Sequence, residues 1–237
     1  MNDASIASKK IGIIGAMACE VEPLIAQMEN AYTLTVGSIT FTEGILCGKQ
    51  TVIAICGIGK VFAAMCAQTM ILHFGVSAIV NVGVAGSLCD GLRIGDIAIA
   101  KSTVQHDMDT SPIGDPVGLI SGINKVYLPC SERLCDLLAD CVSAQGVHYV
   151  LGTVASGDVF VASPEQRARI TGNFDAVACE MEGSAICQVC YANGVEVGIL
   201  RAISDNCNDP STMDYETFRD SSARVGCRIL LDFMSRI

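Results

Sequence analysis

Three acidic residues stand at the ends of otherwise apolar segments, where they could take part in acid–base chemistry. Glu20 follows the apolar run 11–16, Glu182 follows the run 176–180, and Asp205 ends the run 195–204. A single acid in such a place is most often a helix cap or a solvated loop residue. Carboxylates that converge in an apolar cleft can instead supply both a general acid and a general base, because their pKa values are pushed apart. We therefore take these three acids as candidate site residues.

Three glycine-rich segments could bring a ligand close to the backbone, namely residues 12–15, 57–60 and 83–86. The first lacks the full G-x-G-x-x-G dinucleotide motif, and the second lacks the spacing of a P-loop. Taken singly, each segment indicates a tight strand-to-helix turn. Segment 83–86 is also compatible with close approach of a ligand, since glycine has no side chain to prevent it.

No metal site is predicted from the spacing of the ligand-type residues. His106, Asp107 and Asp109 lie close together, but no further His or Cys has the spacing that zinc requires. Cys187 and Cys190 form a lone CxxC in an apolar segment, which favours packing over metal or redox chemistry. The chain has 13 cysteines, many inside apolar runs, as is typical of buried free thiols. Residues 1–10 contain no apolar signal segment, so we expect a reducing, cytoplasmic location.

Apolar periodicity predicts the elements that must position these residues. Strands are expected at 11–16, 34–36, 39–46, 51–56, 78–82, 97–104, 147–155, 176–180 and 195–204, and helices at 20–30, 60–74, 131–145, near 164–170, 182–193 and 215–235. This alternation indicates an α/β protein with a mostly parallel sheet and helices on both faces. We expect a disordered tail at residues 1–9 and one domain over 10–237. In such sheets ligands bind beyond the carboxyl ends of the strands, where the three acids lie.

The composition excludes several classes of partner. The formal charge is −10, from 25 acidic and 15 basic residues. This balance argues against binding to nucleic acid or to an anionic membrane surface, both of which need a basic footprint. No uninterrupted run of about 18 apolar residues is present to span a bilayer.

At its acidic residues and glycine turns the chain closely resembles the 5′-methylthioadenosine/S-adenosylhomocysteine nucleosidases. The motifs that carry the resemblance are 11–17 (IGIIGAM) with Glu20, 57–60 (GIGK), 83–86 (GVAG), 156–160 (SGDVF), 180–182 (EME) and 201–205 (RAISD). Their order and spacing match from Lys10 to the C-terminal helix. The resemblance implies a nucleoside phosphorylase-like three-layer α/β/α sandwich with a mixed, mostly parallel sheet, a homodimer, and a role in methionine salvage and recycling of S-adenosylmethionine by-products. No cofactor is expected.

The resemblance also implies roles for the acids. Glu20 would act as general base on the water that attacks the anomeric carbon, and Asp205 would protonate N7 of adenine. Ser204 would orient Asp205. Glu182 would accept hydrogen bonds from the ribose hydroxyls and offset the positive charge of an oxocarbenium-like transition state.

The remaining positions carried over from the family line the nucleoside. Met181 would pack against the sugar with Gly86 nearby, Phe160 would stack on the purine, the backbone of Val161 and Cys179 would face the base edge, and Met17, Ile58 and Tyr215 would line the alkylthio side, with Arg201 supporting the acids. Val84 stands where the family commonly has a serine, and the loss of that hydroxyl is expected to alter affinity or substrate range.

Phosphorolysis is the main alternative reaction. Phosphorylases of the same superfamily carry arginines near the first glycine turn and before the G-x-A/C-G turn, whereas this chain has Glu20 and the segment 81–82 (NV) there. An acid repels phosphate and activates water, so hydrolysis is favoured. A purine nucleoside phosphorylase and a catalytically silent nucleoside-binding protein remain as alternatives. Among the possible substrates, 5′-methylthioadenosine, S-adenosylhomocysteine, 5′-deoxyadenosine and 6-amino-6-deoxyfutalosine are not ranked by the sequence.

Overall fold

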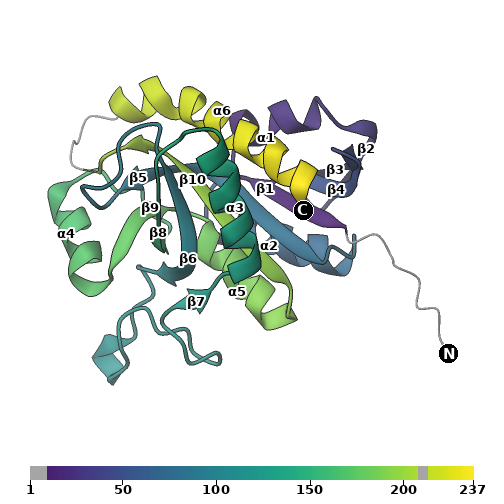
Figure 1. The fold of residues 1–237 in the computed structure, drawn as a ribbon. Helices are drawn as coiled ribbons and strands as arrows, with labels where there is room; N and C mark the ends of the chain where they lie inside the picture. The colour runs from purple at the N-terminus through teal and green to yellow at the C-terminus, as the bar shows by residue number, and fades with distance from the viewer. Residues whose placement is uncertain (1–9, 208–212) are drawn as a thin grey trace.

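Helices cover both faces of a ten-stranded mixed sheet in the computed structural model, which describes residues 10–207 and 213–237 (Figure 1). The strands are β1 (Ile11–Gly15), β2 (Glu29–Val36), β3 (Ile39–Leu46), β4 (Lys49–Ile55), β5 (Ala78–Ser87), β6 (Ile97–Gln105), β7 (Leu128–Pro129), β8 (Tyr149–Ser156), β9 (Ala176–Glu180) and β10 (Glu196–Asp205). The helices are α1 (Ala18–Ile25), α2 (Lys60–Leu72), α3 (Glu132–Ala144), α4 (Pro164–Asn173), α5 (Gly183–Asn193) and α6 (Met213–Arg236), with a 3₁₀ turn η1 (Ser111–Ile113). The expected three-layer α/β/α arrangement is confirmed. The tail expected at residues 1–9 lies outside the described residues.

The sheet has the order β10-β6-β8-β9-β5-β1-β4-β3-β2, and β10 also pairs with β5. Strands β5, β9, β8, β6 and β10 therefore close into a ring. Of the strand pairings between described residues, five are parallel and five are antiparallel. The sheet is mixed as predicted, and its antiparallel pairings are β10–β6, β5–β9, β6–β7 and the two pairings of the β2–β3–β4 meander. Its turns contain Gly37, Cys47 and Gly48 with positive φ, as two-residue hairpin turns require.

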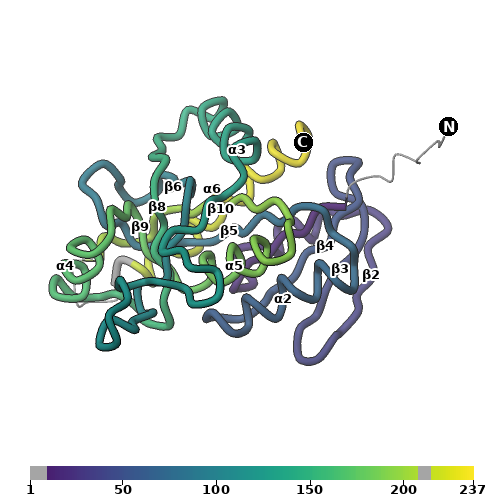
Figure 2. The backbone as a smooth tube through the Cα atoms, turned by 90° about the horizontal axis from the view of Figure 1, so that it is seen from below, coloured from purple at the N-terminus to yellow at the C-terminus, as the bar shows by residue number. Residues whose placement is uncertain are grey.

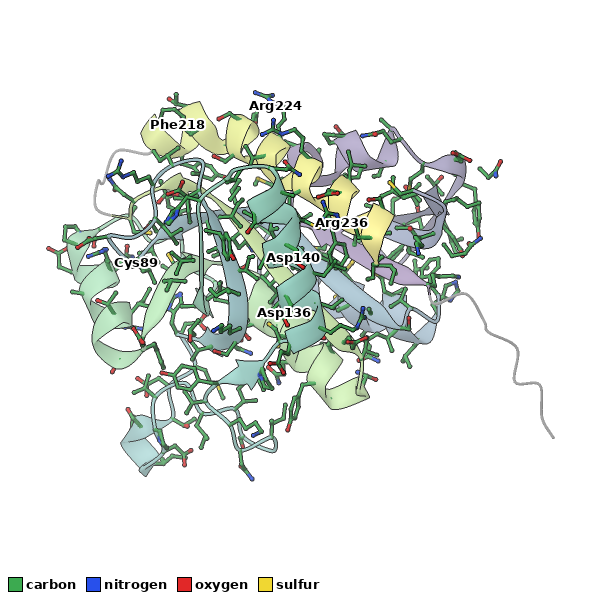
Figure 3. All side chains as sticks on the ribbon, in the orientation of Figure 1. Cys89, Asp136, Asp140, Phe218, Arg224 and Arg236 are labelled. Atoms are coloured by element: carbon green, nitrogen blue, oxygen red, sulfur yellow. The ribbon has the colours of Figure 1, made fainter. Side chains whose placement is uncertain are left out.

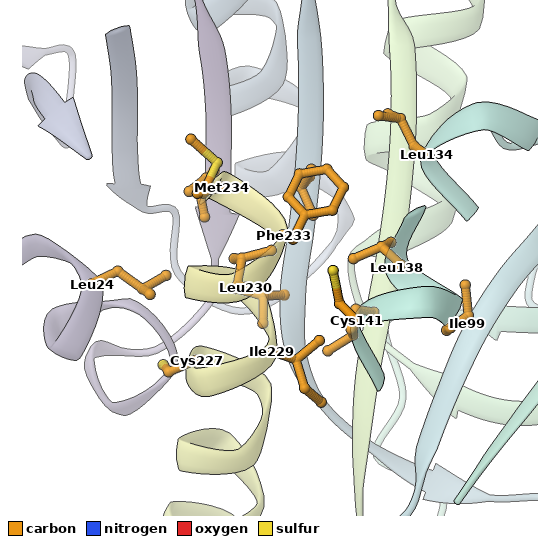
Figure 4. Close-up of a cluster of buried hydrophobic side chains, with 14 of the residues drawn as sticks. Leu24, Ile99, Leu134, Leu138, Cys141, Cys227, Ile229, Leu230, Phe233 and Met234 are labelled. Carbon is orange, nitrogen blue, oxygen red and sulfur yellow. The ribbon is translucent and has the colours of Figure 1, made fainter. Parts of the chain in front are cut away.

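One face of the sheet is covered by α1, α3 and α6, which lie side by side in Figure 1. Their inward side chains form an apolar core with the strands, and Figure 4 shows Leu24 of α1, Leu138 of α3 and Phe233 of α6 converging there. Most outward positions of the same helices are charged or polar. Figure 3 shows Asp136 of α3 and Arg224 of α6 on this outer surface. This division into an apolar and a charged side is what anchors each helix on the sheet.

The opposite face is covered by α2 and α5, which are nearest the viewer in Figure 2. Cys66 and Met70 of α2 pack with Ile186 and Cys190 of α5 in a second apolar cluster. All 13 cysteines are free, and nine of them are buried. Buried thiols acting as small apolar side chains are thus what the sequence predicted.

Several predicted boundaries were wrong, most clearly those of the helix at 20–30, the strand at 34–36 and the strand at 78–82. The helix predicted at 20–30 starts at Ala18 and ends at Ile25, because Glu29 already begins β2. Nearly all of β2 is exposed on both faces, so it lacks the apolar alternation by which a half-buried strand is identified. The segment 83–86, expected as a turn, continues the buried strand β5. No helix in the described part of the chain is long and apolar enough to cross a membrane.

Candidate active site

The carboxyl ends of β1, β4, β8, β9 and β10 and the last residues of β5 meet around one pocket. It encloses about 590 Å³ of empty space, including its open mouth. All fourteen candidate site residues line it, namely Met17, Glu20, Ile58, Val84, Gly86, Phe160, Val161, Cys179, Met181, Glu182, Arg201, Ser204, Asp205 and Tyr215. The pocket lies where ligands bind in sheets of this kind, and its size suits a small organic molecule.

Glu20 is held by backbone N–H groups at the start of α1. Its Oε2 accepts hydrogen bonds from the N–H of Ala16 at 2.7 Å and of Met17 at 2.9 Å, and its Oε1 accepts one from Val84 at 3.1 Å. The side chain is 1% exposed. Burial raises the pKa of Glu20 above that of an ordinary glutamate, although Arg201 and the backbone donors act in the opposite direction. A carboxylate with a raised pKa is suited to accept a proton.

Arg201 is a fully buried cation beneath the pocket. Its Nη2 forms an ion pair with Glu180, lies 3.7 Å from Glu182 Oε2 and donates to Asn81 Oδ1, and its Nη1 lies 3.4 Å from the carbonyl oxygen of Val84. Burial alone would lower the pKa of Arg201, but the neighbouring carboxylates raise it, so the guanidinium stays charged. Arg201 thus supports the acids, as the resemblance implied.

Glu180 joins this cation to the start of α5. It accepts a hydrogen bond from the Ser156 hydroxyl and one from the N–H of Glu182 at 3.0 Å. The N–H of Gly183 donates to both of its carboxyl oxygens, at 2.8 Å and 3.0 Å. These amides are otherwise without partners at a helix N-terminus, where an acid is favourable. Glu180 therefore fixes both the Arg201 head group and the backbone that carries Glu182.

Glu182 lies between the buried cation and the turn at residues 57–60. Its Oε1 accepts a hydrogen bond from the N–H of Gly59 at 2.9 Å, and the residue is 4% exposed. Burial, with the negative charges of Glu180 and Glu20, raises the pKa of Glu182 to about 7, although Arg201 opposes this shift. Glu182 can thus gain or lose a proton near neutral pH.

Asp205 sits at the tip of β10, on the other side of the pocket. Its Oδ2 accepts a hydrogen bond from the Ser204 hydroxyl at 3.0 Å. Its Oδ1 accepts one from the N–H of Cys207 at 3.1 Å. These donors restrict the rotation of the carboxyl group, and Ser204 lies in contact with Asp205, the residue that the resemblance implied it would orient.

The turn at residues 57–60 positions Ile58 at the pocket mouth. Gly57 and Gly59 have φ of 89° and 102°, values that residues with side chains rarely adopt. Asp158 Oδ1 accepts a hydrogen bond from the N–H of Lys60 at 2.8 Å and so holds the turn from the opposite side. The two glycines are therefore needed for the turn conformation, and the N–H groups of Gly59 and Lys60 are bonded to the carboxylates of Glu182 and Asp158.

The remaining wall of the pocket is apolar or aromatic. The ring of Phe160 lies edge-on to that of Tyr215, with centroids 5.2 Å apart. The Tyr215 hydroxyl donates to Met17 Sδ at 3.4 Å. Ile58 and Phe160 are 54% and 43% exposed, which places a partly open apolar rim around the mouth.

Five lining residues were not among the candidates, namely Ala16, Ala85, Val159, Glu180 and Cys207. Four are neighbours of predicted residues and carry no chemical signal of their own in the sequence. Glu180 did carry one, because an acid that ends a buried strand directly before a helix can accept hydrogen bonds from the first backbone N–H groups there, as Glu180 does from Glu182 and Gly183. Within the described residues, no group of three or more His, Cys, Asp or Glu side chains could hold a metal ion.

Residues 10–235 match the phosphorylase superfamily, and the chain belongs to that family, with its nucleoside phosphorylase-like α/β fold. Within it, the chain is similar to nucleosidases. It is 37% identical over 211 residues to the 5′-methylthioadenosine/S-adenosylhomocysteine nucleosidase of Shewanella putrefaciens, covering 88% of this chain and 91% of that one. It is 34% identical to the aminodeoxyfutalosine nucleosidase of Helicobacter pylori, covering 97% and 99%.

A solved nucleosidase structure also matches the fold of this chain. The 5′-methylthioadenosine/S-adenosylhomocysteine nucleosidase of Neisseria meningitidis, in complex with methylthio-immucillin-A, matches with a TM-score of 0.93 at 31% identity. The match covers 97% of this chain and 100% of that one.

Proposed function

We propose that this protein hydrolyses the N-glycosidic bond of 5′-methylthioadenosine and S-adenosylhomocysteine, releasing adenine and the 5′-substituted ribose. The observation that carries the proposal is the convergence of Glu20, Glu182 and Asp205 on one largely apolar pocket. The similarity to nucleosidases over nearly the whole chain supports the same reaction class. The enzyme would act in methionine salvage and in recycling S-adenosylmethionine by-products.

The three acids have complementary tasks in this reaction. Glu20 removes a proton from a water molecule whose oxygen attacks C1′. The electron pair of the C1′–N9 bond passes to the adenine, whose N7 takes a proton from Asp205. Glu182 accepts hydrogen bonds from the ribose hydroxyls, and its charge stabilises the oxocarbenium-like transition state, because a cation forming in an apolar site is strongly stabilised by fixed negative charge.

Water is favoured over phosphate as the nucleophile by the charge of the pocket. Arg201 is the one cationic side chain among the described lining residues, and it is already occupied by Glu180, Glu182 and Asn81. A phosphate dianion near Glu20 would meet repulsion without a free cation to offset it. This disfavours a purine nucleoside phosphorylase, which remains the second candidate.

The apolar rim favours a hydrophobic 5′ substituent. Met17, Ile58 and Tyr215 present thioether, aliphatic and aromatic surface, which suits an alkylthio group. Val84 adds a further apolar side chain where the nucleosidase family commonly has a serine. 5′-Deoxyadenosine and 6-amino-6-deoxyfutalosine are therefore tested beside the two main substrates.

The protein is further proposed to act as a homodimer in the cytoplasm. Val61, Met65 and Leu72 on the outer face of α2 are 70%, 47% and 74% exposed. This apolar face continues from the pocket mouth at Ile58, so a second copy would cover both. The 13 free thiols are compatible with a reducing compartment.

The test is adenine release from the four nucleosides in phosphate-free buffer. We expect turnover without phosphate, and about 100-fold or greater loss of kcat in Glu20→Gln and Asp205→Asn, because a positioned acid or base contributes at least that much. Glu22→Gln is the matched control, since Glu22 lies on the same helix but is exposed.

Three outcomes would contradict parts of the proposal. Strict dependence on phosphate would indicate a phosphorylase. Binding of 5′-methylthioadenosine in calorimetry without any adenine release would indicate a silent binding protein. Near-normal rates in both acid variants would mean that the roles of Glu20 and Asp205 are wrong.

A further inference from the structure

Two buried thiols meet in the wall of the pocket beside Asp205. The sulfur atoms of Cys179 and Cys207 are 3.3 Å apart, and the residues are 5% and 2% exposed. Cys179 is on β9 and Cys207 follows β10, so the contact crosses the intervening strand β5. Both residues line the pocket.

Gly86 of β5 provides the space in which these thiols meet. It is paired with Cys179 on one side and with Asp205 on the other. A Cβ atom at Gly86 would collide with Cys207 Sγ and lie 2.7 Å from Asp205 Oδ1. The thiol of Cys207 therefore fills the volume directly behind the carboxyl group of Asp205.

Cys207 forms hydrogen bonds with Asp205 through both its backbone N–H and its thiol. Its N–H donates to Oδ1 at 3.1 Å, and its Sγ lies 3.6 Å from the same oxygen as a donor. Its φ is +57°, a left-handed conformation that costs energy for a residue with a side chain. This turn brings both donors onto one carboxyl oxygen.

The thiol of Cys207 remains protonated and is therefore a permanent donor. The hydrogen bond with Cys179, burial and the charge of Asp205 all raise the pKa of Cys207 well above the ordinary value. Its single hydrogen has two possible acceptors, Cys179 Sγ and Asp205 Oδ1. When Cys179 donates its own hydrogen to Cys207 Sγ, the hydrogen of Cys207 points to the carboxyl group.

We propose that Cys207 is a positioning residue for Asp205 whose thiol, oriented by Cys179, stabilises the carboxylate left after proton transfer to the base. This inference rests on the proposed function. During the reaction the O–H bond of Asp205 breaks, an N7–H bond forms, and the C1′–N9 electron pair passes to adenine. A donor on Oδ1 binds the resulting carboxylate more strongly than the carboxylic acid, so it favours the transfer.

The test compares two substrates that differ in their need for this proton. 5′-Methylthioadenosine requires protonation of N7, whereas its N7-methylated analogue already carries the positive charge and cannot accept a proton there. We expect Cys207→Ala to lower kcat for 5′-methylthioadenosine about 5-fold, which corresponds to about 1 kcal/mol, with little change in KM. Cys207→Ala should hydrolyse the N7-methylated substrate at nearly the rate at which the wild-type enzyme hydrolyses it.

Two further variants separate positioning from packing. Cys207→Ser retains a donor and should restore most of the kcat for 5′-methylthioadenosine. Cys190→Ala removes a buried thiol of α5 far from Asp205 in the sequence and outside the pocket lining, so it should leave the ratio of the two rates unchanged. Thermal melting of each variant verifies that it is folded.

Several results would overturn the inference. An equal slowing of both substrates by Cys207→Ala, or a serine variant as slow as the alanine variant, would show that the thiol only fills space. Unchanged kcat in Cys207→Ala would exclude any role. These outcomes require an active wild-type enzyme. A wild type that releases no adenine would instead overturn the proposed function and this inference with it.

Discussion

The buried guanidinium of Arg201 faces three glutamates, and this imbalance of charge governs how the site responds to pH. Glu20, Glu180 and Glu182 are all buried, and all three contribute to the raised pKa of Arg201. One cation cannot neutralise three carboxylates in a site with little water, so protonation of a glutamate relieves the repulsion. Burial raises the pKa of Glu20 as well, and Glu182, whose pKa is raised to about 7, is the group that changes its charge near neutral pH.

The first prediction concerns the stability of the ligand-free protein between pH 5 and pH 8. Because the pKa of Glu182 is about 7 in the folded state and near the reference value of 4.5 when unfolded, only the folded state holds the extra proton between these values. The stabilising contribution is complete below about pH 4.5 and is lost as the pH rises through 7. The wild-type melting temperature should therefore fall from pH 5 to pH 8 more steeply than that of Glu182→Gln. If the melting temperatures of the wild type and Glu182→Gln changed in parallel with pH, this titration would be excluded. Glu22→Gln, at an exposed position, is the control and should follow the wild type.

At the scale of elements, the continuous strand β5 determines the floor of the pocket. Ala78–Ser87 is buried throughout and is hydrogen-bonded to β1, β9 and β10. Gly83 and Gly86 are needed because a side chain at either position would collide with neighbouring atoms, and not because of their backbone conformation. A Cβ at Gly83 would lie 2.8 Å from Glu20 Oε1, and a Cβ at Gly86 would lie 2.7 Å from Asp205 Oδ1. The strand thus approaches both acids as closely as a backbone can.

Gly86→Ala should displace Asp205 without unfolding the sheet. The added methyl group collides with Cys207 and crowds the carboxyl group, so we expect a loss of kcat of about 10- to 100-fold, the range that a misplacement of roughly 1 Å causes. Gly172→Ala is the matched control. Gly172 lies in α4 with no atom near the position of an added Cβ, and the change should leave activity unaltered. Full activity of Gly86→Ala would mean that the position of Asp205 is not critical.

At the scale of the whole molecule, the two faces of the sheet differ in what they present to their surroundings. Outer positions of α3 and α6 are charged, as Asp136, Asp140 and Arg236 show in Figure 3. The outer face of α2 instead carries Val61, Met65 and Leu72. The proposed homodimer would cover this apolar face, which is unusual on a chain with a formal charge of −10.

Charged residues on this face should therefore prevent self-association. We expect the double variant Met65→Glu, Leu72→Glu to be monomeric and the wild type dimeric by light scattering after size exclusion, because paired acids cannot be buried against a second copy. Leu34→Glu on the edge strand β2 is the control, since Leu34 is also exposed. A wild type that is monomeric at all concentrations would contradict the proposed homodimer.

Local patterns in the sequence determined the element types, the burial of the thiols and the identity of the acids. Apolar runs and glycine turns predict strands and helices because both depend on near neighbours along the chain. Each acid stands out because it interrupts such a run at its end. The first part of β2 and the boundaries of α1 were missed for the same reason, since an edge strand exposed on both faces leaves no periodic signal.

Only the tertiary structure decided which groups lie against one another. Glu180 holds Arg201 and the start of α5, and Cys207 meets Cys179 across β5. These contacts join residues of different strands, and their distances follow from strand order and register, which no local pattern encodes. The raised pKa of Glu182 also arises in this way, because burial and the charges around a carboxyl group exist only once distant segments have packed together.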